Sequence, residues 1–282
     1  MTKSRLAFAI VITIAMMLIQ FIFTRVDGLL PTEGVSNLSY QIFWFISTII
    51  ETFIALWITK KYLSFNKIGL KTSGLVRSFL YSFVFVLLWR GIVFTSSGTY
   101  NPDFLQNINP PLIIFLLLAA FSEELLFRGV ILKSWIRSNG FLAGLFISSI
   151  SFGLIHIFAP FDSNLNSMTG AGATVVVLFT GLIFGPTYSL IAYRTNNIVG
   201  LTISHFIFNA FIFINVFTQN AAFPDNMNSI ILSVILIPIV YPIIIDTIDR
   251  KLFPNDALAK IHWGKYLFGM LGVFILAAAF VV

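Results

Sequence analysis

The chain has 282 residues, of which 58% are hydrophobic and only 10% are charged, and it contains 32 phenylalanines. Its mean hydropathy of +0.94 lies outside the range of soluble globular domains and predicts a polytopic membrane protein. The absence of cysteine excludes disulfides, thiolate catalysis and cysteine-ligated metals.

Apolar runs recur along the whole sequence, and a transmembrane helix needs about 20 such residues. The runs lie at about 6–24, 39–59, 77–97, 111–133, 141–159, 170–193, 197–217, 228–248 and 266–282. They predict an all-α, polytopic transmembrane bundle of about eight or nine spans, depending on whether the short last run crosses the bilayer or lies in its interface. Because no linker separates any group of spans, residues 1–282 are expected to form a single integral membrane domain.

The basic residues are distributed by loop and not gathered in one patch, although the formal net charge is +6. They fall on alternate loops, which follows the positive-inside rule and predicts a cytoplasmic N-terminus. The groups are Lys3 and Arg5; Lys60, Lys61, Lys67, Lys71 and Arg77; Lys133 and Arg137; Arg194; and Arg250, Lys251, Lys260 and Lys265. The expected surroundings are therefore a lipid bilayer, with no nucleic-acid partner. The bias toward Asn, Ile and Phe is compatible with a bacterial cell membrane, and the sequence predicts no oligomeric state.

Three charged side chains interrupt the fourth apolar run. Glu123, Glu124 and Arg128 stand between Leu112 and Leu132, among residues that are otherwise almost wholly apolar. A central charge costs roughly 2.5 to 3.5 kcal/mol on translocon scales, so three together indicate chemistry more than packing.

The spacing of these residues indicates different tasks for the two carboxylates. Adjacent helical residues point about 100° apart, whereas residues four apart share a face. We therefore expect Glu124 to pair with Arg128, and Glu123 to project separately as a candidate general base. A pair that only fixes helix packing is the alternative for Glu124 and Arg128.

Two of the three histidines lie in predicted spans. His156 is in the fifth run, and His205 is in the seventh, four residues before Asn209. His205 and Asn209 therefore share a helix face and could donate hydrogen bonds to a developing oxyanion. A lone histidine in a span is more often an interhelical hydrogen-bonding group than a catalyst. The histidines therefore indicate function only in combination with the other polar residues of the spans.

Further charged residues are expected to be structural. Glu51 and Arg90, in the second and third runs, are interpreted as a structural pair. Asp246 and Asp249 stand close to a predicted cytoplasmic end and are expected to be solvated.

These residues resemble the motifs of the CPBP intramembrane proteases, which include the CAAX prenyl endopeptidases and the Abi bacteriocin-immunity proteins. Three motifs match in order across about residues 110–218. The pattern Glu-Glu-x-x-x-Arg falls on Glu123, Glu124 and Arg128, Phe-x-x-x-His on Phe152 and His156, and His-x-x-x-Asn on His205 and Asn209.

The resemblance implies an intramembrane endopeptidase with a polar cavity between the fourth, fifth and seventh spans. Glu123 and His156 would activate a water, His205 and Asn209 would stabilise the oxyanion, and Glu124, Arg128 and Phe152 would support the site. No cofactor is expected, because a zinc site would leave Asn209 without an evident role among the ligands. A zinc ion bound by Glu123, His156 and His205 is the alternative.

Other intramembrane protease chemistries lack their residues. The sequence has no His-Glu-x-x-His, no Gly-x-Ser-x-Gly and no Gly-x-Gly-Asp. The predicted substrate is a peptide or a membrane-associated protein, with or without a lipid. Two alternatives stay open at this point: a non-proteolytic bacteriocin-immunity or regulatory scaffold that binds a partner, and a proton-coupled carrier that uses Glu123 and the histidines as a relay.

Overall fold

The computed structural model describes residues 3–27, 38–97, 110–157, 184–217, 237–254 and 261–279. These residues are helices and short connections, with no strand among them, so the all-α prediction is confirmed. The described helices coincide with the apolar runs of the sequence, while residues 170–183 and 228–236 of two predicted spans lie outside the described residues.

The order of elements follows the chain. It is α1 (Lys3–Asp27), α2 (Leu38–Ile58), η1 (Thr59–Leu63), α3 (Phe65–Ile68), α4 (Leu75–Ser97), α5 (Pro110–Glu123), η3 (Glu124–Ile131), α6 (Leu132–Asn139), α7 (Phe141–Ile157), α9 (Val199–Phe217), α11 (Ile237–Leu252) and α12 (Trp263–Ala279). A further helical segment covers residues 184–195. Here η marks a π-helical turn, in which hydrogen bonds join residues five apart.

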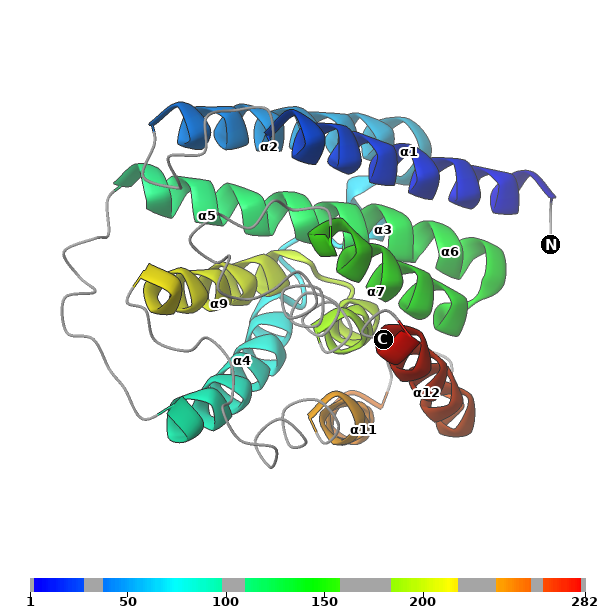
Figure 1. Cartoon of the computed structure of the whole chain (residues 1–282). Coiled ribbons are helices and arrows are strands. Elements are labelled where there is room, and N and C mark those ends of the chain that lie inside the picture. The colour runs from blue at the N-terminus through cyan, green and yellow to red at the C-terminus, as the bar shows by residue number, and fades with distance from the viewer. Residues whose placement is uncertain are drawn as a thin grey trace.

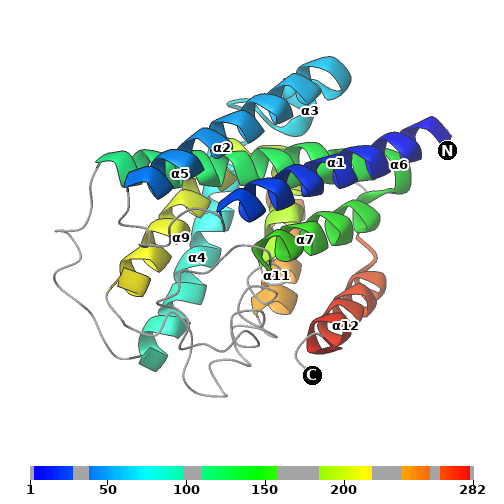
Figure 2. The ribbon, with the colours of Figure 1, turned by 45° about the horizontal axis from the view of Figure 1, so that its top comes forward.

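One continuous rod, made of α5, η3 and α6, organises the bundle. In Figure 1, α1 and α2 run along one side of this rod, and α4, α7 and α9 lie on its other side. In Figure 2, after rotation, α1 passes across the rod, and α11 and α12 lie below α7. The middle of the rod is therefore enclosed from both sides.

That middle is η3, and all eight of its residues are buried. The wider turn is supported from a neighbouring helix, because the Ser148 hydroxyl of α7 donates a hydrogen bond of 2.8 Å to the Phe127 carbonyl. The same carbonyl accepts from the backbone N–H of Leu132, five residues later. Isolated π turns occur frequently at functional sites.

None of the helices in the described part of the chain combines the length and the apolar character that a membrane crossing requires. The predicted spans therefore stay a prediction.

A network of buried charges ties α11 to the rest of the bundle. Asp246 forms ion pairs with Arg194 and, at 3.0 Å, with Arg250. Asp249 lies 3.6 Å from Arg77 and accepts a hydrogen bond of 3.1 Å from Tyr81. The expectation that both aspartates are solvated is wrong, because each is only 2% exposed and each has an arginine partner from a distant segment.

A second connection holds the start of α9 against the loop before α4. The Asn197 side chain donates to the carbonyls of Lys71 and Ser73 and accepts from the backbone N–H of Gly200. It thus caps α9, satisfying one of the free N–H groups at the helix start. This connection fixes the end of α9 that precedes His205.

Gly200 lets α9 approach α4 closely. A Cβ atom at this position would stand 2.5 Å from both the Leu75 carbonyl oxygen and the Phe79 backbone nitrogen. Small residues at helix contacts allow such approaches, and overpacking costs about 1 to 3 kcal/mol. We expect Gly200→Ala to destabilise the protein by about that amount in thermal unfolding followed in detergent.

Gly264→Ala is the matched control, because no described residue outside the local helix backbone lies within 4 Å of a Cβ atom built at Gly264. Alanine is favoured over glycine in helices by about 1 kcal/mol, so this variant should be as stable as wild type or slightly more stable. Equal unfolding temperatures for the two variants would contradict the close contact of α4 and α9.

Candidate active site

The centre of the site is an ion pair inside the rod. The Arg128 guanidinium lies 3.0 Å from Glu124 Oε1, and both side chains are 0% exposed. The predicted pairing of these residues is therefore present. Because neither group reaches solvent, each depends on its protein neighbours to balance its charge.

His205, from α9, joins this pair. Its Nδ1 lies 2.8 Å from Glu124 Oε1, and its Nε2 lies 3.5 Å from Glu123 Oε2. The expectation that the two carboxylates serve separate faces is wrong here, because they contact opposite nitrogens of one imidazole. The imidazole ring lies between the two carboxylates. Two side chains that point in different directions from adjacent positions can therefore contact the same ring.

The contact with Glu124 orients the imidazole. A carboxylate paired with arginine can only accept hydrogen bonds, so His205 Nδ1 carries the hydrogen in this contact. His205 Nε2 is then directed toward Glu123. This is the arrangement in which a buried carboxylate holds an imidazole for proton transfer on its other nitrogen.

The two glutamates differ in their access to solvent. The Glu123 side chain is 22% exposed, whereas the Glu124 side chain is fully covered. A water can therefore reach Glu123 but not Glu124. Of the two carboxylates, Glu123 is the one placed to exchange a proton with a reactant.

The charges of the cluster balance in a simple way. With Glu124 and Arg128 neutralising one another, Glu123 and His205 together are neutral when they share one proton. That proton can reside on the carboxylate or on His205 Nε2 without creating a net buried charge. Burying an uncompensated charge is expensive, so this arrangement favours transfer within the pair.

Aromatic rings enclose the charged groups. The Arg128 guanidinium lies 4.2 Å from the Phe152 ring centre and 5.5 Å from that of Tyr188. The same rings lie edge-on to the imidazole of His205, at 6.0 and 5.9 Å. The structure thus places Phe152 beside the cluster, where its ring keeps water away from Arg128.

Tyr188 and Ser204 are residues that the sequence analysis missed. The Tyr188 hydroxyl shares a hydrogen bond of 3.1 Å with Ser204 on α9, which holds its ring between Arg128 and His205. One tyrosine among eight in an apolar sequence carries no signal of this role. Only the fold could reveal it.

Glu51, from α2, approaches the same region. Its Oε2 accepts a hydrogen bond of 3.4 Å from Ser122, the residue before Glu123. The Arg90 side chain, its expected partner, lies outside the described residues, so the predicted pair stays a prediction. The contact with Ser122 brings a further buried carboxylate beside α5.

The other predicted site residues are placed only in part. His156 belongs to α7, but its side chain lies outside the described residues. Asn209 is half-buried on α9, about one turn after His205. No group of three metal-binding side chains occurs among the described residues, which do not include the imidazole of His156.

The described residues thus form a helical bundle with a buried carboxylate–imidazole centre, a kind of centre used in acid–base catalysis. Residues 105–211 match the family described as type II CAAX prenyl endopeptidase Rce1-like, which corresponds to the CPBP and CAAX protease family that the motifs resemble. The resemblance seen in the motifs is therefore confirmed. The family is one of membrane proteases, so the match supports a protease at the membrane. Comparison with curated proteins and with solved structures finds no match.

Proposed function

We propose that the chain is a polytopic intramembrane endopeptidase that cleaves a peptide or a membrane-associated protein by attack of an activated water. The observation that carries this proposal is the contact of one imidazole with two glutamates of unequal exposure. Such an arrangement provides a reachable base and a fixed partner for it. The family match over residues 105–211 supports a protease at the level of the family.

In the proposed reaction, Glu123 accepts a proton from a water as that water attacks the scissile carbonyl. His156 would help to hold the water. The developing oxyanion would receive hydrogen bonds from His205 Nε2 and from the Asn209 amide, which lie on successive turns of α9. The proton on Glu123 then passes to the leaving amine, and no metal ion takes part.

Glu124 and Arg128 act on this reaction through His205. The Glu124 carboxylate keeps the imidazole in one orientation, and Arg128 holds that carboxylate in place by pairing with it. Phe152 and Tyr188 limit the access of water to the pair. Preorganised charges in such surroundings stabilise a transition state more than they would in water.

The surface of the bundle supports the membrane setting of this proposal. Large apolar side chains are exposed on α1, α2, α4 and α12, including Val11, Phe53, Val76 and Phe268. Phe53 is 71% exposed and Phe268 is 79% exposed. Contiguous exposed apolar surface is typical of sites that meet membranes or other proteins.

Cleavage of a membrane-peptide library tests the function directly. Full-length protein in nanodiscs would be incubated with the library, beside a Glu123→Gln/His205→Ala double variant, each with and without a chelator. We expect products from wild type alone, and we expect the chelator to leave them unchanged. Mass spectrometry of the products would define the substrate sequence, with lipidated and unlipidated peptides included.

Two outcomes would count against the proposal. Products that vanish with chelator would move Glu123, His156 and His205 to the role of zinc ligands. The same products from the double variant, with both proteins folded, would show that this cluster does not carry the reaction.

A further inference from the structure

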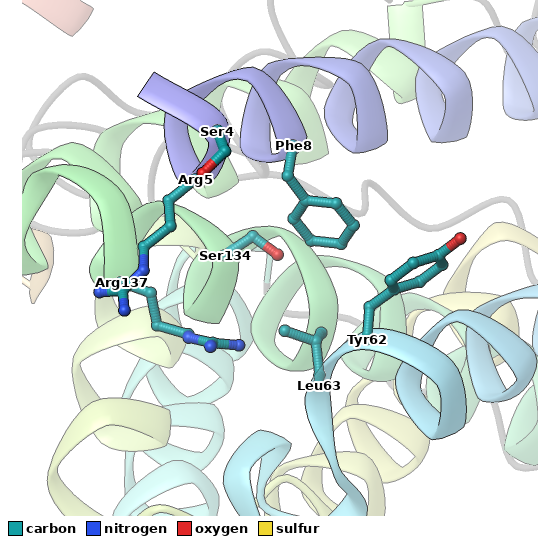
Figure 3. A pocket seen from close by; sticks show the side chains of 7 residues that line it. All are labelled: Ser4, Arg5, Phe8, Tyr62, Leu63, Ser134 and Arg137. Atoms are coloured by element: carbon teal, nitrogen blue, oxygen red, sulfur yellow. The ribbon is translucent and has the colours of Figure 1, made fainter. Parts of the chain in front are cut away.

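A cavity of about 170 Å³ lies away from the carboxylate–imidazole centre. It is lined by Ser4, Arg5, Phe8, Tyr62, Leu63, Ser134 and Arg137. These residues come from the start of α1, from η1 and from α6 (Figure 3). Arg137 follows Arg128 by nine residues, which separates the two by roughly 14 Å along the rod at 1.5 Å per residue.

The cavity is positively charged. Arg5 and Arg137 both line it, and none of the acidic residues in the described ranges does. Within the described part of the chain, neither arginine has an ion-pair or hydrogen-bond partner. Figure 3 shows the two guanidinium groups on the same side of the cavity. Guanidinium groups recognise phosphate through paired N–H donors, so two of them favour a phosphate-bearing ligand.

A buried hydroxyl completes the polar side. Ser134 is 3% exposed, and its Oγ has no hydrogen-bond partner among the described residues. In Figure 3 this oxygen is directed into the cavity, between the arginines and the aromatic rings. A buried polar group without a partner is unfavourable, and an oxygen of a bound ligand would satisfy it.

The opposite side of the cavity is apolar. Phe8, Tyr62 and Leu63 form it, and the rings of Phe8 and Tyr62 lie 5.3 Å apart. The Lys61 ammonium lies 5.1 Å from the Tyr62 ring centre and 4.9 Å from that of Trp57. Aromatic rings interleaved with cations are typical of the level at which lipid headgroups meet hydrocarbon chains.

The charge pattern of the sequence assigns all three contributing segments to one side of the membrane. Arg5, Lys61 and Arg137 belong to three separate loops of the predicted cytoplasmic set. The fold brings residues of these segments to a single cavity. A ligand that spans them therefore approaches from that side, where basic residues attract anionic lipids.

We propose that Arg5, Arg137 and Ser134 form a binding site for the phosphate of an anionic phospholipid, whose glycerol and upper chain carbons lie against Phe8, Tyr62 and Leu63. The site joins α1 and η1 to α6, and so to the rod that carries Glu124 and Arg128. This inference rests on the membrane setting of the proposed function but not on its chemistry. Its test therefore measures lipid binding and not cleavage.

The test compares lipids and variants by native mass spectrometry of the full chain in detergent. The ligands are phosphatidylglycerol, zwitterionic phosphatidylcholine and inorganic phosphate. The variants are Arg5→Gln/Arg137→Gln, Ser134→Ala and the charge-matched control Lys251→Gln/Lys265→Gln. Lys251 and Lys265 are exposed and do not line the cavity.

We expect wild type to bind phosphatidylglycerol at least tenfold more tightly than the arginine double variant, because each basic residue near an anionic surface contributes about a fewfold gain in affinity. Ser134→Ala should weaken binding a few-fold, while the lysine control should bind as wild type does. Phosphatidylcholine should bind weakly to all forms.

Three results would overturn the proposal. If the lysine control lost as much binding as the arginine double variant, the binding of phosphatidylglycerol would be due to general charge attraction. Inorganic phosphate that binds as tightly as the lipid would indicate a free-anion site with no part for the apolar wall. Unchanged binding of phosphatidylglycerol by the arginine double variant would exclude the cavity as the site.

Discussion

Replacement of Glu123 by glutamine is expected to lower the rate of peptide cleavage by roughly 10²- to 10⁴-fold, the usual contribution of a positioned general base. Glutamine retains the size of the side chain but cannot accept a proton from water at neutral pH. The side chain is partly exposed at the surface of the cluster, so folding should be unaffected. Single-turnover cleavage of a peptide from the library would measure the change.

The neighbouring residue provides the control for this variant. Ser122→Ala removes a hydroxyl whose hydrogen bond goes to Glu51. We expect its cleavage rate to stay within about threefold of wild type, since the acid–base pair is intact. Glu123→Gln with more than a tenth of the wild-type rate, and with an unchanged melting temperature, would remove Glu123 from the role of base.

The secondary structure and the local pair could be predicted from sequence because both depend on short-range periodicity. Apolar runs of helical length predicted the helices, and the spacing of four residues predicted the contact of Glu124 with Arg128. Both inferences need only the geometry of one helix. The family motifs supplied the remaining residues, because no local pattern joins His205 to Glu124 across the fold.

The meeting of Glu123 and Glu124 on one imidazole could not be predicted in the same way. The projection argument considered one helix alone, whereas the contact depends on where α9 places His205. In addition, the rod changes from α5 to the π turn of η3 at Glu124, which widens the helix next to the two carboxylates. An inserted turn of this kind leaves no clear trace in hydrophobic periodicity.

Asp246 and Asp249 also show that contacts between segments distant in the sequence could not be predicted. Counting residues from the end of a predicted span places them near water, but Arg194 and Arg77 come from other segments and cover them. Ion pairs between distant segments are a property of the packing. They could be found from sequence only with co-variation among related sequences.

Replacement of Arg128 by methionine is expected to destabilise the protein by about 3 to 5 kcal/mol, the cost of removing one partner of a buried ion pair. Glu124 would remain fully covered, with His205 as its remaining polar partner among the described residues. Methionine fills much of the space beneath Phe152, so the loss would reflect charge more than volume. Equilibrium unfolding in mixed detergent micelles would give the free energy.

A pair with the same spacing provides the comparison. Asp246 and Arg250 are also four residues apart with a 3.0 Å contact, but the Arg250 side chain is 32% exposed and Asp246 keeps Arg194 as a second partner. Arg250→Met should therefore cost no more than about 1 kcal/mol. The double variant Glu124→Leu/Arg128→Met should be less destabilised than Arg128→Met alone, because it leaves no unpaired carboxylate. Equal losses for Arg128→Met and Arg250→Met would mean that solvent screens the central pair, contrary to its burial beneath Phe152 and Tyr188.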